Sequence, residues 1–438
     1  MADFKPLHIV IVGAGLGGLA AAFCFARDGH HVGLYERKPA FEAKGGGIML
    51  RPNATRYLRQ WGLEIDFTAI ADPSAGTTFF NSHTGDVIMH RPGLTFTIGG
   101  NPDWQTVRRE TQIVFHEHAK SAGANLHWGV TISDVEEDSD GATATLSTGE
   151  KIKADIIFAA DGIMSRLRPK IIPDAPQPNV GRTTLHQAEA TEQDVLADKE
   201  AHDLVTTKDL EVYMSASGGG YVISSFKKSL GRHNAVFGIA EAADADERLW
   251  DEHGDIKYVR DYFKDVHPKL KAFLNIVTSC DRWRLAEMPD MPQWVSKGGR
   301  LVLLGDSAHA MYPDAAMGFS SIVEDIATLS YLLKEHQNKG IPTLTKIWQE
   351  VRIPRVNKLK AWANFNNKLY TKGLTPAKPE IKKQEAAHAE VASNEPESLK
   401  PDSNADFRSP AFVMWAYGYD AVGEVKKYMD GVGGQAQF

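Results

Sequence analysis

Short apolar runs alternate with glycine-rich and charged stretches in the first part of the chain. Residues 8–12 (HIVIV) and 31–37 (HVGLYER) are rich in β-branched and apolar side chains, as buried parallel strands are. Between them, LAAAFCFARDG is apolar over the length of a helix and reaches a glycine at Gly29, which is typical of a helix end. The pattern therefore predicts a strand–helix–strand unit.

Two later segments have the same kind of buried strand followed by a turn. They are ADIIFAADGIMSRLR (154–168) and a segment whose strand is LVLL (301–304). After the second strand, irregular chain runs through Pro313. Ser321 and Glu324 then have the spacing of a capping box, so we expect the next helix to begin near Ser321.

The middle of the chain has a different hydrophobic pattern from the first part. Within residues 181–284, runs such as LEVYMSAS and HNAVFGIAEA alternate between apolar and polar positions and predict strands of a second sheet. DIKYVRDYFKDVHPKLKAFLNIV (255–277) predicts one or two helices with a break at Pro268.

Three patterns follow one another towards the C-terminus. Residues 345–372 predict helix and are rich in Lys and Arg, which favours a solvated face. Residues 376–406 are poor in apolar side chains and rich in Pro, Glu, Lys and Ser, which is typical of a mobile insertion. Residues 409–425 are again apolar and aromatic, so we expect them to dock back on the body of the protein.

The turn after the first strand contains a candidate nucleotide-binding motif. Gly13-x-Gly15-x-x-Gly18 opens the predicted helix, and Glu36 ends the second strand. In a dinucleotide site, these glycines permit a tight turn, approach to the pyrophosphate and close helix–strand packing, while the acid accepts hydrogen bonds from a ribose. The motif does not distinguish NAD from FAD. The alternatives are a turn kept for packing, or a signal or membrane segment, although four glycines interrupt the apolar run.

Composition narrows the class of protein. The chain has 438 residues, 42% of them hydrophobic and 24% charged, which is ordinary for globular domains. A net charge of −7 argues against general nucleic-acid binding, which needs a basic surface. Only two cysteines are present, Cys24 and Cys280, and their spacing is not that of metal ligands. We therefore expect a reducing, cytoplasmic location and no metal site. We also expect no transmembrane segment.

Three motifs in order carry a family resemblance. They are the glycine motif, ADGIMSR and GDSAHAMYP, joined by GGGIMLRPNATRYLRQWGL (45–63) and VRRET (107–111). With them, residues 7–350 resemble the FAD-dependent aromatic hydroxylases, which are single-component flavoprotein monooxygenases, and in particular their fungal salicylate-hydroxylase-like members.

The resemblance implies an α/β fold of the p-hydroxybenzoate-hydroxylase type. Its Rossmann-like FAD-binding domain would be discontinuous, and a sheet-based substrate domain and C-terminal helices would complete it. The expected boundaries are 1–75, 105–180 and 285–345 for the FAD-binding domain, 76–104 and 181–284 for the substrate domain, and 346–438 for the C-terminal region.

The resemblance also implies residues that contact FAD. Glu36 would hold the adenosine ribose, Arg109 the ribityl-phosphate side, and Asp306 the ribityl chain. Asp161 and Gly162 would serve both FAD and the nicotinamide. The full set is Gly13, Gly15, Gly18, Glu36, Arg37, Gly46, Gly47, Arg109, Val130, Asp161, Gly162, Asp306, Pro313, Gly318 and Phe319.

The substrate side departs from the family pattern. His186 and Gln187 align with a Tyr-Arg pair of many fungal relatives, so the arginine is missing; His186 could be a base or a structural histidine. Tyr221 resembles a pocket tyrosine, with a structural role as the alternative. In DAAMGF, Met317 replaces a glutamine and Asp314 adds a charge near the expected flavin front. We expect His309 to be structural.

By resemblance, the expected reaction uses NADPH or NADH and O2 to insert one oxygen atom into an aromatic, phenol-like small molecule through a flavin C4a-hydroperoxide. Epoxidation or dearomatising hydroxylation in natural-product biosynthesis is one alternative. A flavin enzyme without oxygen insertion and a nucleotide-binding protein without activity are the others. The sequence leaves the oligomeric state open.

Overall fold

A five-stranded parallel sheet carries the predicted strand–helix–strand unit. The computed structural model describes residues 4–74, 76–92, 97–215, 219–242, 250–371 and 400–431. The sheet has the order β19-β12-β1-β2-β8. Its strands are β1 (His8–Val12), β2 (His31–Glu36), β8 (Asn125–Trp128), β12 (Ile156–Ala159) and β19 (Leu301–Leu303).

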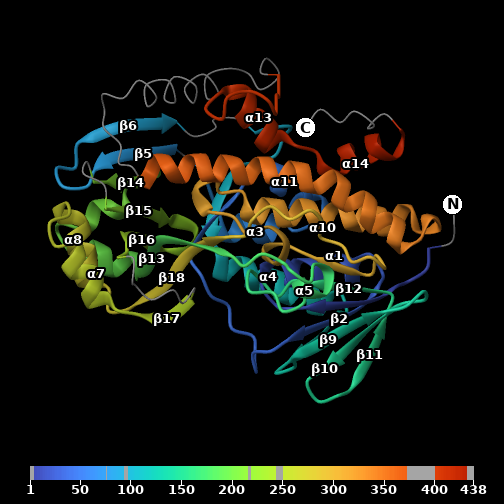
Figure 1. Cartoon of the computed structure of the whole chain (residues 1–438). Helices are drawn as coiled ribbons and strands as arrows, with labels where there is room; N and C mark the ends of the chain where they lie inside the picture. Colours follow the sequence, from blue (N-terminus) through green and yellow to red (C-terminus); the bar gives the residue numbers. More distant parts are fainter. Residues whose placement is uncertain are drawn as a thin grey trace.

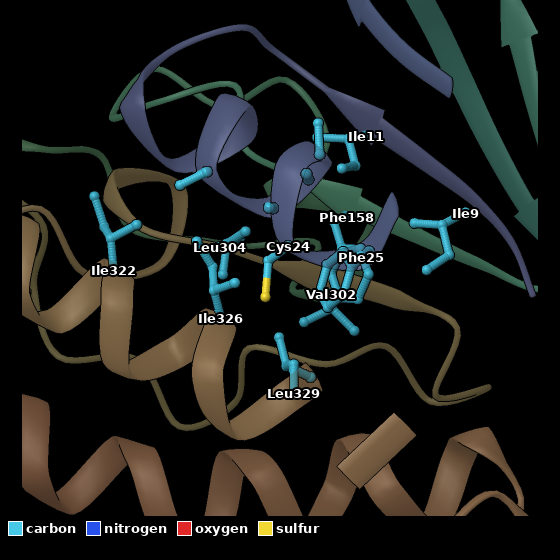
Figure 2. Close-up of a cluster of buried hydrophobic side chains, with 14 of the residues drawn as sticks. Ile9, Ile11, Cys24, Phe25, Phe158, Val302, Leu304, Ile322, Ile326 and Leu329 are labelled. Atoms are coloured by element: carbon cyan, nitrogen blue, oxygen red, sulfur yellow. The ribbon is translucent and has the colours of Figure 1, made fainter. Parts of the chain in front are cut away.

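Helices and a small antiparallel sheet cover the parallel sheet. Helix α1 (Leu16–Arg27) packs between the sheet and α10 (Gly318–Glu335), where Phe25 stacks on Phe158 and Cys24 is fully buried (Figure 2). In Figure 1, α10 and α11 (Ile341–Thr371) lie above the sheet, and β9 (Ile132–Glu137), β10 (Ala142–Leu146) and β11 (Lys151–Ala154) lie below it. Around this core lie α2 (Pro52–Gln60), α3 (Glu64–Ile70), α4 (Arg108–Ser121) and α5 (Arg168–Ile171).

The second large sheet is the one that the alternating pattern predicts. It has eight strands in the order β17-β18-β13-β16-β15-β14-β5-β6. They are β5 (Gly76–Asn81), β6 (Val87–Pro92), β13 (Asn179–Thr191), β14 (Leu210–Met214), β15 (Gly220–Lys227), β16 (Arg232–Ala240), β17 (Trp250–Gly254) and β18 (Cys280–Glu287). Helices α7 (Ile256–Tyr262) and α8 (Pro268–Ile276) cover one face, with α6 (Glu192–Leu196) beside them. Pro268 is the first residue of α8, so the predicted break falls before it.

A three-stranded sheet and the C-terminal helices join the two halves. The small sheet has the order β3-β7-β4, with β3 (Gly47–Leu50), β4 (Asp72–Pro73) and β7 (Trp104–Val107). Helices α13 (Pro410–Gly418) and α14 (Ala421–Met429) pack on the body, as expected for residues 409–425. Residues 376–399 of the predicted mobile insertion (376–406) lie outside the described residues. No helix among the described residues is long and apolar enough to cross a membrane.

Two sequence predictions are wrong. Helix α10 begins at Gly318, one turn before Ser321, because the Ser321 hydroxyl donates to the Met317 carbonyl and the Glu324 carboxylate is engaged elsewhere, so no capping box forms. The Lys- and Arg-rich helix α11 does not present a purely solvated face, because Arg352 and Arg355 are fully buried.

Candidate cofactor and substrate site

A cleft of about 370 Å³ opens at the carboxyl ends of β1, β2 and β12. In parallel α/β sheets this edge is where dinucleotides bind. Seven of the predicted FAD residues line the cleft, and they are Gly13, Gly15, Glu36, Arg37, Val130, Asp161 and Gly162. The cleft therefore gathers residues from three separate parts of the sequence.

The glycine turn fits closely between neighbouring backbones. Gly13 has a φ of +103°, and a Cβ there would lie 2.5 Å from the Ala160 oxygen. A Cβ on Gly18 would lie 1.8 Å from the Gly13 oxygen. A Cβ on Gly15 would meet no protein atom within 4 Å, so the space above Gly15 is free for a ligand. Since no side chain caps α1, its first N–H groups point to this space.

Glu36 is held at the rim of the cleft. Its carboxylate accepts hydrogen bonds from the backbone N–H groups of Ala14 (2.8 Å) and Lys38 (2.9 Å). The N–H of Val130 donates to the Glu36 carbonyl at 2.9 Å. These bonds fix the carboxylate and the neighbouring strand edge in the position where a ribose and a purine would lie.

Asp161 has an unused acceptor. Its Oδ2 accepts from the N–H of Arg166 at 2.8 Å, while its Oδ1 is buried without a hydrogen-bond partner among the described residues. An unsatisfied buried oxygen is costly, so a donor on a bound ligand would stabilise it.

The arginine at the cleft is Arg108. Arg108 and Gln112 line the cleft, and neither was predicted from the sequence. Arg109, the predicted residue, forms ion pairs with Glu110 at 2.9 Å and Glu189 at 3.4 Å and does not line it. Two adjacent arginines give no sequence signal that separates them, since only the backbone direction at the start of α4 decides which one points into the cleft.

The last motif forms the turn before α10. Asp306 begins the short helix α9 (Asp306–His309), and its carboxylate has no hydrogen-bond partner within the described part of the chain. Pro313 begins a single 3₁₀ turn, Gly318 begins α10, and the buried ring of Phe319 packs near Phe115. No side chain caps α10, which leaves the positive end of its dipole uncompensated.

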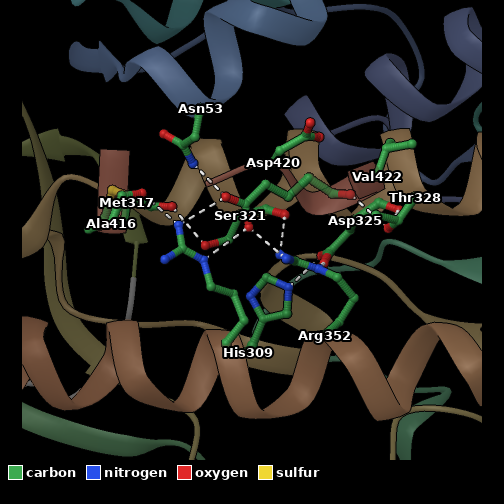
Figure 3. A network of polar contacts seen from close by, with 12 residues as sticks. Asn53, His309, Met317, Ser321, Asp325, Thr328, Arg352, Ala416, Asp420 and Val422 are labelled. Carbon is green, nitrogen blue, oxygen red and sulfur yellow. Dashed lines mark hydrogen bonds and ion pairs between the residues drawn. The ribbon is translucent and has the colours of Figure 1, made fainter. Parts of the chain in front are cut away.

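A buried ionic network holds α10 in place (Figure 3). Arg352 donates to Glu324 at 2.6 Å and to Asp325 at 2.8 Å, and His309 Nε2 lies 2.6 Å from Asp325. Arg355 also pairs with Glu324, at 3.0 Å. Burial by itself raises the pKa of Glu324, but the two guanidinium groups outweigh it and hold that pKa below its usual value. His309 thus has a structural position, as expected.

These features fit FAD. The close glycine turn, the fixed Glu36 carboxylate, the unpartnered Asp161 oxygen and the uncapped helices α1 and α10 suit a pyrophosphate, a ribose and a flavin ring that gains negative charge on reduction. The described residues contain no group of three or more His, Cys, Asp or Glu side chains that could hold a metal ion.

Asp306→Ala is expected to weaken FAD retention, because it removes the free carboxylate that the family resemblance assigns to the ribityl chain. The loss of one charge-assisted hydrogen bond corresponds to roughly tenfold in the dissociation constant. Equilibrium titration of the FAD-free protein measures it. A variant that keeps FAD as tightly as the wild type would contradict this placement.

The eight-stranded sheet, which we call the substrate sheet, has two faces with different neighbours. Cross-strand register places Phe237, Val222 and Tyr213 on the face under α7 and α8. The opposite face contacts Tyr312, which immediately precedes Pro313 in the turn before α10. This turn lies on the side where the flavin is expected. We call this opposite face the flavin-side face. Its apolar part includes Leu185, Val212, Met214, Tyr221, Ile223, Val236, Trp283 and Leu285.

The three predicted substrate-side residues separate onto these faces. Tyr221 lies on the flavin-side face and packs on Gly238. Gln187 lies on the same face, so close to Gly46 that a Cβ on Gly46 would stand 1.9 Å from Gln187 Nε2. His186 points to the other face, where its ring meets Tyr258 of α7 at 5.9 Å. Burial lowers the pKa of His186, and this position favours the structural role over that of a catalytic base.

Together, the fold and the cleft define an α/β dinucleotide-binding protein with a separate substrate sheet. A family model described as "FAD binding domain" matches residues 7–363, so the chain belongs to this FAD-binding family. The family and its named relatives make it an FAD-dependent monooxygenase of the aromatic-hydroxylase type.

Two curated relatives span most of the chain. The FAD-dependent monooxygenase OpS4 of Beauveria bassiana (strain ARSEF 2860) is 28% identical over 431 residues, which cover 95% of this chain and 96% of that protein. A 6-hydroxynicotinate 3-monooxygenase of Bordetella bronchiseptica (strain ATCC BAA-588 / NCTC 13252 / RB50) is 27% identical over 390 residues, covering 84% and 93%.

Solved structures share the fold. CtdE in complex with FAD and a substrate has a TM-score of 0.80 at 20% identity, covering 97% of this chain and 98% of that one. A salicylate hydroxylase substrate complex has a TM-score of 0.73 at 19% identity, covering 96% and 97%. The α/β architecture with a parallel-sheet FAD domain and a sheet-rich substrate domain is confirmed.

Proposed function

We propose that this monooxygenase uses NADPH or NADH and O2 to insert one oxygen atom into an aromatic, phenol-like small molecule. The observation that carries the proposal is the flavin-side face, which combines an apolar, aromatic wall with buried amide groups at one end. Such a wall suits a flat ring with one polar edge. A relative named 6-hydroxynicotinate 3-monooxygenase supports an aromatic substrate.

Bound FAD would supply hydride acceptance and oxygen activation, and the protein supplies position and shielding. The Gly13–Gly18 turn and α1 would hold the pyrophosphate, and Glu36 would hold the ribose. The positive end of α10 would stabilise negative charge on the flavin ring. The apolar wall around Tyr221 keeps water from the reacting atoms.

One experiment tests this function. NADPH and NADH oxidation by the FAD-loaded protein is measured with and without a panel of phenols and indoles, and the product mass and released hydrogen peroxide are determined. Acceleration together with a gain of one oxygen atom is the expected result. Acceleration with peroxide but without that gain points to a flavin enzyme that does not insert oxygen, and no acceleration by any compound contradicts a phenol-like substrate.

Epoxidation or dearomatising hydroxylation is the second candidate. It is favoured by Gln187, a neutral amide on the flavin-side face at the position where the family resemblance implies an arginine. The product structure separates the two. A ring that stays aromatic supports hydroxylation, whereas an epoxide or a lost aromatic ring supports the alternative.

A further inference from the structure

The flavin-side face ends in a cluster of polar side chains that the sequence did not reveal. Each member is less than a tenth exposed, and together they are Gln105, Gln187, Ser225, Lys227 and Asn234. They come from β7, β13, β15 and β16, and the cluster lies against β3 and β7, next to Gly46. The cluster is therefore buried between the substrate sheet and the part of the FAD domain that leads into Arg108.

Hydrogen bonds join the members of the cluster into two groups. Lys227 Nζ is 2.7 Å from Gln105 Oε1 and 2.9 Å from Ser225 Oγ. Ser225 directly opposes Asn234 in the β15–β16 ladder, and directly opposed side chains are neighbours. Asn234 Oδ1 accepts from Gln187 Nε2 at 3.4 Å. The group Gln105–Lys227–Ser225 and the pair Gln187–Asn234 therefore meet where Ser225 opposes Asn234.

Two polar atoms of the cluster remain unpaired. Gln187 Oε1 and Asn234 Nδ2 are buried and have no hydrogen-bond partner among the described residues. One is an acceptor and the other a donor, and each costs free energy when left unpaired. Asn234 Nδ2 can donate to a ligand oxygen, before and after that oxygen loses a proton, whereas Gln187 Oε1 needs a separate donor on the ligand.

The lysine has only neutral hydrogen-bonding partners. Lys227 forms no ion pair within the described residues. Asp72 of β4 and the buried His233 interact with it electrostatically, and Arg232 is its cross-strand neighbour. Glu189 is already shared by Arg232 at 2.8 Å and Arg109 at 3.4 Å. Burial lowers the pKa of Lys227 to about 7, and Asp72 offsets only part of this effect.

The hydrogen-bonding partners of Lys227 can bind its amine in both the protonated and the neutral form. Gln105 Oε1 can only accept, so one N–H always points to it. The Ser225 hydroxyl can accept from an ammonium group or donate to a neutral amine. A neutral Lys227 therefore keeps both hydrogen bonds, with its lone pair directed to the Ser225 hydroxyl.

We propose that Lys227, acting through Ser225, accepts the proton of an acidic phenol- or enol-type hydroxyl group whose oxygen accepts a hydrogen bond from Asn234 Nδ2. The substrate O–H bond breaks, its proton passes to Ser225 Oγ, and the Ser225 proton passes to Lys227 Nζ. The products are a substrate oxyanion and an ammonium ion, without any change in oxidation state. The inference rests on the proposed function, because an oxyanion makes a ring electron-rich and ready for oxygen transfer.

The test uses the FAD-loaded full chain with para-nitrophenol, whose phenolate is yellow and whose phenol is colourless. The probe is added at a pH below its own pKa to the wild type, Lys227→Met, Ser225→Ala and Lys228→Met. Lys228 is the exposed neighbour and serves as the matched control. We expect yellow, bound phenolate with the wild type and Lys228→Met, and its loss by tenfold or more with Lys227→Met and Ser225→Ala.

Equal phenolate formation in the wild type and Lys227→Met overturns the proposal, as does the absence of any colour with the wild type. NADPH and NADH oxidation with the same samples reports separately on the proposed function. Phenolate without accelerated oxidation would support the proton acceptor and contradict the function. Oxidation accelerated equally in the wild type and Lys227→Met would support the proposed function and contradict the role of Lys227 as proton acceptor.

A second measurement does not depend on turnover or on binding. Between pH 7 and about 10.4, the unfolded chain keeps the proton on Lys227 and the folded protein does not, so this residue makes stability rise with pH. Denaturant midpoints across this window should therefore increase more steeply for the wild type than for Lys227→Met. Parallel curves would show that the buried amine stays charged and would overturn the proposal.

Discussion

Replacing Arg352 with methionine is expected to lower the free energy of unfolding by about 3–5 kcal/mol, because it leaves buried carboxylate charge without its partner. Arg352 contacts both Glu324 and Asp325, and all three side chains are fully buried. Arg355 would then be the remaining guanidinium for Glu324. Chemical denaturation measures the change.

Two variants make this prediction specific. Lys346→Met removes an exposed charge from the same helix and should change stability by less than about 0.5 kcal/mol. Adding Asp325→Asn to Arg352→Met removes the stranded carboxylate and should restore part of the loss. If the single variant is as stable as the wild type, the network does not hold α10. FAD retention should fall with stability, since α10 begins at the flavin-side turn.

The second large effect concerns two glycines of one motif. Gly18→Ala is expected to destabilise the FAD-free protein by several kcal/mol, since its Cβ would lie 1.8 Å from the Gly13 oxygen and backbone must move. Gly15→Ala should leave the FAD-free protein as stable as the wild type, because Gly15 has an ordinary φ of −70° and open space around it. Its FAD affinity should nevertheless fall by about tenfold or more, since the methyl group occupies the path of the pyrophosphate.

Thermal unfolding without FAD and FAD titration measure the two effects independently. The pair of variants separates packing from ligand approach, because the same chemical change is made three residues apart. Unchanged FAD binding by Gly15→Ala would mean that the pyrophosphate does not pass above this residue.

The local parts of the site could be predicted from the sequence. The glycine turn and Glu36 lie within one strand–helix–strand unit, and backbone geometry and neighbour contacts fix them wherever that unit forms. The parallel strands and the alternating substrate sheet followed from hydrophobic period in the same way. These features depend on residues that are close along the chain.

Other features were decided by contacts between distant segments. Arg352 and Arg355 lie on a helix rich in basic residues, and only Glu324 and Asp325 of another helix make their burial tolerable. Likewise, Gln105 and Lys227 are 122 positions apart, and their contact exists only because β7 packs against the substrate sheet.

The sequence by itself therefore determined the dinucleotide-binding turn, the two sheets and the family. The tertiary structure decided which side chains share a site. It turned His186 away from the flavin side, chose Arg108 over Arg109 at the cleft, and buried Lys227 beside Gln105 and Ser225. The physical reason is that strand period and turn geometry are local, whereas the face that a side chain presents and the charge that it can carry depend on what packs against it.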